Sequence, residues 1–161
     1  MKEEVTFINF RKEHGLELVQ LWRKSFAQAM SIEEDTREEV VNEHLAYLQT
    51  YNPKIIRVAL KKNKSKIVGF MAKDESTIKD LFIHVDYQRR GLGSSFIDQA
   101  KEEEKFLTLS TFQLNKGAQK FYEFHDLVIT RRGFAGPEGN AWARNKEQLA
   151  DITYEWKRDR R

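Results

Sequence analysis

The sequence predicts a mixed α/β fold, in which a central, mostly antiparallel sheet of about seven strands carries helices on both faces. Three observations support this prediction. Short stretches of alternating apolar residues mark strands, apolar residues at helical spacing mark helices, and the two kinds follow each other in the order β-α-α-β-β-β-α-β-α-β-β. Only the step from the fourth strand to the fifth crosses through a helix, so only this pair must be parallel.

The first third of the chain is expected to form one strand and two helices. Residues 5–10 alternate in polarity, and apolar residues recur at helical spacing over residues 14–30. Residues 36–39 (Thr-Arg-Glu-Glu) match a capping box, which predicts that Thr36 caps the second helix, and Pro53 ends that helix.

The remaining elements follow from β-rich and helical stretches separated by turns. Residues 55–60 and 66–72, joined by a short polar loop, predict an antiparallel hairpin. Beyond it we expect a strand over residues 78–85, a helix over 92–104, a strand over 106–110, a helix with Asn115 as N-cap, and final strands over 127–134 and 152–157.

The composition is that of a globular protein, expected to form a single domain over residues 1–161. Apolar residues make up 40% of the chain and charged residues 33%, which excludes a disordered polymer. No apolar stretch approaches the roughly 20 residues that span a bilayer. The first residues lead directly into a strand without the apolar region of a signal peptide, so we expect a cytoplasmic protein without membrane contact.

Metal and nucleic-acid binding are not expected. The sequence contains no cysteine, which removes thiolate ligands and a cysteine nucleophile, and its four histidines lie far apart without ligand spacing. A net charge of +3 is only mildly basic, which disfavours nucleic acid as a partner.

The most informative segment is a basic turn with two glycines, residues 86–95 (Asp-Tyr-Gln-Arg-Arg-Gly-Leu-Gly-Ser-Ser), between the fourth predicted strand and the next helix. The first backbone N–H groups of a helix have no partner within it, and the helix dipole adds positive charge there. Gly91 and Gly93 allow a ligand close to the backbone, and Arg89 and Arg90 add full charges. A pyrophosphate-sized anion would fit such a turn, although an ordinary strand-to-helix turn with solvated arginines is the alternative.

Two well-known phosphate loops do not match this turn. A Walker loop has Lys-Ser or Lys-Thr after its last glycine, where this chain has Ser-Ser, and a dinucleotide fingerprint has three glycines early in a βαβ unit. Instead, Gln-Arg-Arg-Gly-Leu-Gly resembles the Gln/Arg-x-x-Gly-x-Gly/Ala loop of the GNAT superfamily of acyl-CoA N-acyltransferases, whose order of elements is also similar. The resemblance assigns the cofactor pyrophosphate to Gln88, Arg89, Arg90, Gly91, Leu92, Gly93, Ser94 and Ser95.

The strand before the turn, residues 78–85, is similar to the fourth strand of that family. The resemblance implies that backbone groups of Ile83, His84 and Val85 bind the pantetheine arm of CoA as another strand would. Val85 stands where the family usually has proline, which should matter little for a backbone contact. A plain buried strand explains the same apolar residues.

Residues 115–123 (Asn-Lys-Gly-Ala-Gln-Lys-Phe-Tyr-Glu) resemble the Asn-x-x-Ala-x-x-Phe-Tyr-Glu helix of the family. The resemblance places Asn115 and Ala118 at the cofactor and the Tyr122 hydroxyl near the thioester sulfur. Taken alone, Asn115 could be only an N-cap and Tyr122 only a core aromatic. The next residues, Asp126-Leu127, replace the usual Gly-Phe, so the turn after this helix differs from the family pattern.

Direct acyl transfer from a thioester to an amine suits these residue types. A tyrosine with a pKa of about 10 is protonated at pH 7 and can give its proton to a leaving thiolate, which would make Tyr122 the general acid. Asp80 and His84 share one face of the predicted strand and are the candidates for the general base, ahead of Glu75. No covalent intermediate is needed, so the missing cysteine is no obstacle.

The resemblance assigns selectivity for the acceptor to the first two helices and the late strand connection. These segments contain Trp22 and Phe26, which could equally be core residues, and an isolated Trp142. We therefore predict an N-acetyltransferase that takes acetyl-CoA and a small primary amine, as a monomer or homodimer. Transfer of a longer acyl group, transfer to a peptide amine, and a non-catalytic acyl-CoA-binding module remain alternatives.

Overall fold

The computed structural model describes residues 4–63 and 65–159. The strands are β1 (Val5–Asn9), β2 (Ile56–Lys61), β3 (Lys66–Asp74), β4 (Thr77–Ile83), β5 (Phe106–Phe112), β6 (Val128–Phe134) and β7 (Ala150–Lys157). The α-helices are α1 (Gly15–Met30), α2 (Glu38–Leu48), α3 (Leu92–Glu103) and α4 (Lys116–Phe124). Short 3-10 turns cover Lys12–His14, Pro53–Ile55, Val85–Tyr87 and Lys146–Leu149. The predicted α/β class and order of elements are confirmed.

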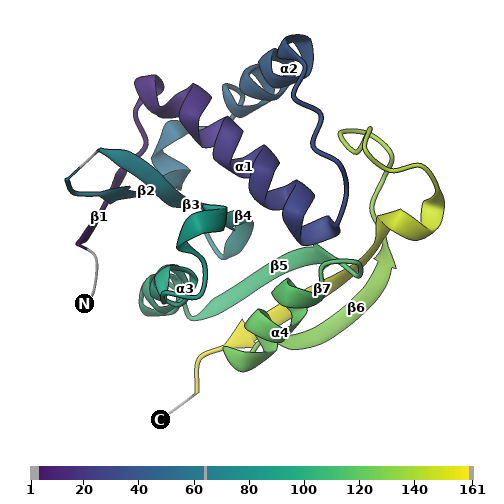
Figure 1. Ribbon diagram of the computed structural model, residues 1–161. Coiled ribbons are helices and arrows are strands. Elements are labelled where there is room, and N and C mark those ends of the chain that lie inside the picture. The colour runs from purple at the N-terminus through teal and green to yellow at the C-terminus, as the bar shows by residue number, and fades with distance from the viewer. Residues whose placement is uncertain (1–3, 64, 160–161) are drawn as a thin grey trace.

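The strands form one mixed sheet in the order β1-β2-β3-β4-β5-β7-β6 (Figure 1). Every neighbouring pair is antiparallel except β4 and β5, which are parallel as predicted. Their pairing is confined to Thr77 opposite Thr108, beside a hydrogen bond from the Thr108 N–H to the Ser76 carbonyl (2.9 Å). Beyond this point β4 and β5 are not paired with each other along the described chain.

Residues of one strand alternate between two cores, one on each face of the sheet. Met71 packs with Phe96 of α3 and Tyr122 of α4, whereas its neighbour Phe70 packs with Trp22 of α1. Helices α1 and α2 therefore cover one face and α3 and α4 cover the other (Figure 1). We refer to these faces as the α1 side and the α3 side.

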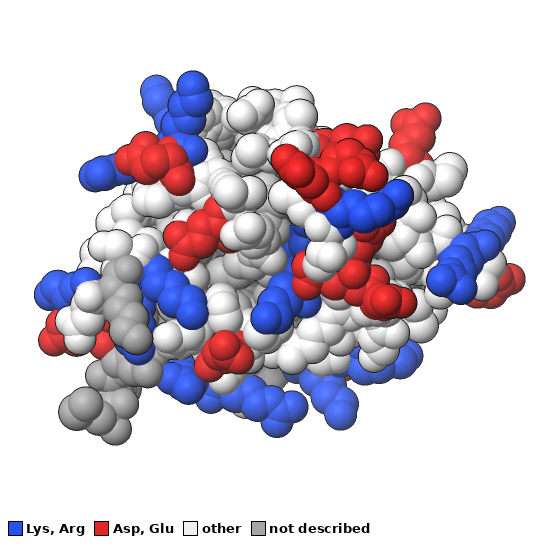
Figure 2. Space-filling view, turned by 45° about the horizontal axis from the view of Figure 1, so that its top comes forward, with Lys and Arg blue, Asp and Glu red and all other residues white. Residues whose placement is uncertain are grey.

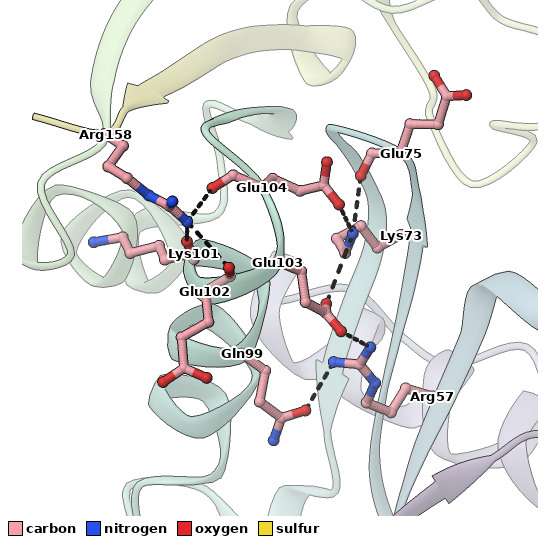
Figure 3. Close-up of polar contacts among 9 residues, drawn as sticks. All are labelled: Arg57, Lys73, Glu75, Gln99, Lys101, Glu102, Glu103, Glu104 and Arg158. Carbon is pink, nitrogen blue, oxygen red and sulfur yellow. Dashed lines mark hydrogen bonds and ion pairs between the residues drawn. The ribbon is translucent and has the colours of Figure 1, made fainter. Parts of the chain in front are cut away.

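Polar contacts fasten the C-terminal end of α3 to the sheet (Figure 3). Arg57 of β2 pairs with Glu103 and Lys73 of β3 pairs with Glu104, each at 2.6 Å. Arg158, just after β7, donates to three carbonyls in the last turn of α3, those of Lys101, Glu102 and Glu104. These contacts satisfy carbonyls that a helix end leaves without partners, and they hold α3 at the end opposite the glycine turn.

Two predicted boundaries are wrong. Thr36 does not cap α2, because the Asp35 carboxylate accepts the N–H of Arg37 (3.2 Å) and its guanidinium (2.7 Å), and Arg37 becomes the N-cap. Strand β4 ends before the predicted residue 85, because Nδ1 of His84 accepts the N–H of Asp86 (3.0 Å) and starts a 3-10 turn.

Candidate functional site

A bulge in β4 decides which of its side chains face α1. The register between β3 and β4 shifts between Ile78 and Asp80, so Lys79 is an extra residue in β4. After the bulge, Phe82 packs with the core on the α1 side and Ile83 with the core on the α3 side. Asp80, two residues before Phe82, therefore lies on the α1 side.

The backbone beyond the bulge presents groups toward β5. The N–H of His84 donates to the Val68 carbonyl (2.9 Å), so by the alternation of an antiparallel ladder the groups of Leu81 and Ile83 point away from β3. On that side the pairing with β5 has already ended. The prediction for residues 83–85 needs one correction: the His84 N–H is used within the sheet, and Leu81 and Ile83 carry the groups that face β5.

Side chains from two neighbouring segments meet at the last residue of β4. The Ile83 carbonyl accepts hydrogen bonds from Oγ of Ser25 in α1 (2.8 Å) and from Nε2 of Gln88 (3.1 Å). Gln88, predicted to contact the cofactor, thus fixes the start of the glycine turn to the end of β4.

The glycine turn has the geometry of an anion site. Gly91 is the N-cap of α3 with φ of +89°, a left-handed conformation that favours glycine, and a Cβ there would meet nothing within 4 Å. The Ser95 N–H donates to the Gly91 carbonyl (3.0 Å) and closes the first helical turn, so it is not the free donor that we predicted. The N–H groups of Leu92, Gly93 and Ser94 precede that bond and lack a helical acceptor.

Gly93 lies where α4 packs closely against α3. A Cβ on Gly93 would lie 3.0 Å from the Phe121 ring, so α4 approaches the first turn of α3 where the side chain is missing. Beside it, Oγ of Ser94 lies 2.9 Å from Nε2 of His125, and Lys101 donates to the His125 carbonyl. The last turn of α4 thus fixes the first turn of α3.

Positive charge gathers beside the glycine turn around one aromatic ring. The guanidinium of Arg90 lies 5.1 Å from the ring centre of Tyr87, and the ammonium groups of Lys61 and Lys66 lie at 5.3 and 5.4 Å. Cation–π attraction stabilises such groups at a ring face. Arg89 adopts a positive φ of 62° at the start of the turn. The cationic surface next to the free N–H groups therefore includes Lys61 and Lys66 as well as the two arginines that the sequence predicted.

Helix α4 carries the predicted Asn-to-Tyr segment. Oδ1 of Asn115 accepts the N–H of Ala118 (3.0 Å), so Asn115 is an N-cap, the alternative that the sequence left open for it. Tyr122 is 8% exposed and packs with the core on the α3 side. Burial, followed by the charge of Asp80, raises the pKa of Tyr122, so its hydroxyl stays protonated near neutral pH.

Asp80 is held by a tyrosine that the sequence analysis did not single out. The hydroxyl of Tyr51 donates to Oδ2 of Asp80 at 2.6 Å. Burial raises the pKa of Asp80 to about 6, against the lowering effects of the Tyr51 hydrogen bond and of Lys79. A carboxylate with this pKa is ionised at pH 7 and is still a usable base.

His84 is less suited to accept a proton. Its Nδ1 is occupied by the N–H of Asp86, which leaves the ring proton on Nε2. Burial and the charge of Lys66 lower its pKa. Glu75, the third candidate, is exposed in the turn before β4 with φ of 52°.

The predicted acceptor residues occupy two different environments. Trp22 belongs to the core on the α1 side and stacks on Phe82 with ring centres 5.7 Å apart. Phe26 and Trp142 are partly exposed and contact each other at 5.4 Å. Trp142 also contacts Phe112 at 5.1 Å, so the loop after β6 rests on the end of β5.

Sequence reasoning missed Tyr51, Phe82, Phe112 and His125. Phe82 could have been found from the alternation of β4 and Phe112 from its place at the end of β5. No local pattern marks Tyr51 or His125, because their partners are Asp80 and Ser94, far away in the sequence.

Outside this site, the described residues show neither a group of metal ligands nor a membrane-spanning helix. Within residues 4–63 and 65–159 no three His, Asp or Glu side chains are arranged to hold a metal ion. No helix of the same residues is long and apolar enough to cross a membrane. Figure 2 shows acidic and basic side chains interspersed over one face of the molecule.

A comparison with protein families matches the central part of the chain to one family. Residues 53–126 match the family described as an acetyltransferase (GNAT) domain. This part of the chain is therefore similar to a GNAT acetyltransferase domain. The match runs from the turn before β2 to the residues after α4, so it includes β4, the glycine turn and Tyr122. The GNAT family generally uses acyl-CoA as co-substrate, which makes acyl transfer the indicated activity.

Solved structures share the fold over nearly the whole chain. The apo form of YjaB from Escherichia coli has a TM-score of 0.73 at 21% identity, covering 97% of this chain and 99% of that one. A GNAT-family acetyltransferase from Staphylococcus aureus has a TM-score of 0.66 at 16% identity, covering 97% of this chain and 100% of that one. An acetyltransferase from Thermus thermophilus has a TM-score of 0.68 at 16% identity, covering 98% of this chain and 99% of that one. No curated protein matches the chain significantly. Identities this low support the GNAT fold and not a shared substrate.

Proposed function

We propose that the GNAT domain is an N-acetyltransferase that transfers the acetyl group of acetyl-CoA to the primary amine of a small molecule. The observation that carries the proposal is the order of features along β4. The strand loses its partner β5, directs the Leu81 backbone groups and the Ile83 N–H away from β3, and runs into the free N–H groups of α3. A linear cofactor with an amide-rich arm and a pyrophosphate suits that order.

The residues along β4 and the glycine turn fit acetyl-CoA, which would supply an activated acetyl thioester. Leu92, Gly93 and Ser94 would bind its pyrophosphate through their N–H groups, and the cations around Tyr87 would add charge. The Leu81 backbone groups and the Ile83 N–H would bind the pantetheine amides as a neighbouring strand does, because the Ile83 carbonyl is already used by Ser25 and Gln88. The open space at Gly91 supports a close approach to the backbone.

Asp80 and Tyr122 would move the protons of the reaction. Asp80, ionised near neutral pH, would take a proton from the ammonium group of the acceptor, so that the neutral amine can attack the carbonyl. Tyr122 would then give its proton to the sulfur as the C–S bond breaks. Although burial raises the pKa of Tyr122, it disfavours a thiolate in the same surroundings too, so the transfer remains feasible.

An acetyl-CoA turnover assay across a panel of primary amines, read by released thiol, tests the proposal. We expect release that depends on the amine and on Tyr122. Tight CoA binding without turnover of any amine would favour a non-catalytic acyl-CoA-binding module instead. Faster turnover with longer acyl-CoA or with peptide amines would favour the other two alternatives.

A further inference from the structure

A group of aromatic rings lies at the end of β5, at the edge of the core on the α1 side. Phe26 of α1, Phe112 of β5 and Trp142 of the loop after β6 form what we call the ring cluster. Their ring centres are 5.1 to 6.0 Å apart, and each pair meets edge to face. All three side chains are partly exposed, and Phe112 and Trp142 pack with neither core. Partly exposed rings that gather in one place form a contiguous apolar surface, which is typical of a ligand site.

The ring cluster is connected to Asp80 on the same side of the sheet. Phe26 contacts Phe82 at 6.4 Å as well as Phe112 at 6.0 Å, so one ring of α1 bridges β4 and β5 where they are no longer paired. Phe82 lies two residues from Asp80 on the same face of β4. An ionised carboxylate and an apolar aromatic surface are thus neighbours on the α1 side.

We propose that the acceptor is a primary amine with an aromatic or other apolar body. This inference rests on the proposed function. The ammonium nitrogen would bind at Asp80, and the apolar body would lie against the ring cluster. Aromatic side chains provide apolar contact area and a favourable surface for an organic cation. Trp142 would be the main determinant of specificity, because it contacts both other rings of the cluster and packs with neither core.

The charges nearby favour one cationic centre over several. Asp80 is the carboxylate that lies beside Phe82, with Tyr51 as its hydrogen-bond donor. The acidic side chains at the start of α2 are solvent-exposed, and Arg37 already pairs with Asp35 and Glu39 among them. Exposed charges contribute little to affinity. A polyamine or amino sugar would have to place its remaining polar groups against the aromatic rings, where Asp151, opposite Phe112, supplies one further, partly buried carboxylate.

The test compares phenylethylamine, n-propylamine, spermidine and glucosamine as acceptors in the thiol-release assay. We expect phenylethylamine to have the highest kcat/KM. Trp142→Ala should raise its KM about tenfold, or 1.4 kcal/mol, while the KM of n-propylamine and the affinity for CoA stay nearly unchanged. Trp142→Phe, which keeps a ring, should restore most of the loss. Val128→Ala, which removes an exposed apolar side chain at the other end of β6, is the control and should leave both KM values unchanged.

A higher kcat/KM for spermidine or glucosamine, or an equal KM increase for all amines in Trp142→Ala, would overturn the inference and leave the proposed acetyltransferase intact. Binding of phenylethylamine to the CoA complex, measured by ligand-observed NMR, separates the two proposals. If no amine is turned over, the proposed function fails. Binding that Trp142→Ala abolishes would then still support the ring cluster as an amine site, and no binding would refute it.

Discussion

The α3 side and the α1 side of β4 are built in different ways. On the α3 side, the candidate contacts are backbone groups of residues 81–94 and side chains of one helix, α4. On the α1 side, side chains from α1, β4, β5 and two connections meet, and their residues lie far apart in the sequence. Backbone donors tolerate many sequences as long as the turn keeps its shape, whereas a side-chain surface changes with every substitution. The comparison suggests a constant cofactor on one side and a protein-specific acceptor on the other.

The largest effect expected on the α3 side comes from Tyr122→Phe, which keeps the ring and removes the proton. General acids contribute roughly 10²–10⁴-fold, so kcat should fall by that range. CoA affinity and Tm should change little, because the apolar area remains. Single-turnover measurement avoids a limit set by product release. If Tyr122→Phe has the single-turnover rate of the parent protein, Tyr122 is a core aromatic. The proposed role of the α3 side is then cofactor binding alone.

On the α1 side, Asp80→Asn should lower kcat by about a hundredfold, the lower end of the range for a general base. In the parent protein kcat should fall about tenfold per pH unit below pH 6, because the base must be ionised and its pKa is about 6. In Asp80→Asn this fall of kcat at acidic pH should disappear. If kcat of the variant still falls about tenfold per pH unit below pH 6, another group is the base.

The same pKa predicts the pH dependence of stability. The folded-state pKa of Asp80 is raised from 3.8 to about 6, so the cost of burying the ionised group is absent below about pH 4, grows up to about pH 6 and is complete above it. The shift of about two units corresponds to at most roughly 3 kcal/mol. Asp80→Asn should therefore raise Tm relative to the parent at pH 8 but not at pH 4. A buried carboxylate that costs stability would be retained for the proton transfer that we propose.

The sequence predicted the helix starts on the α3 side but not the bulge or the side-chain contacts on the α1 side, and the reason is physical. The glycine turn and the Asn115–Tyr122 segment are local patterns whose spacing reflects helix starts and backbone shape. By contrast, the bulge at Lys79 leaves no mark in the alternation of apolar residues, and the hydrogen bond between Tyr51 and Asp80 depends on how α2 is connected to the sheet. The Thr36 cap failed for a related reason, since the Asp35–Arg37 ion pair displaced a valid local motif.

A moderate effect is expected at the N-cap of α3. Gly91→Ala places a Cβ in open space but in a left-handed conformation that costs roughly 1–2 kcal/mol. As the turn relaxes, its N–H groups should move and CoA affinity should fall about tenfold, measured by calorimetry. Gly91→Asn should lose less, because asparagine tolerates this conformation. Gly136→Ala, another glycine with open space and no positive φ, should bind CoA normally. A lower Tm with unchanged CoA affinity in Gly91→Ala would separate the turn from cofactor binding.

The smallest expected effect tests whether α4 holds the anion turn. Ser94→Ala removes the hydrogen bond to His125, and a net hydrogen bond contributes about 0.5–1.5 kcal/mol, so CoA affinity should fall a few-fold. S-acetylpantetheine lacks the pyrophosphate, so its kcat/KM should not change. Ser95→Ala is the matched control, because its hydroxyl bonds only to the Gly91 carbonyl of its own helix. Equal losses with both thioesters would mean that the Ser94–His125 contact positions Tyr122 rather than the anion turn, and α4 would then link cofactor binding to the acid.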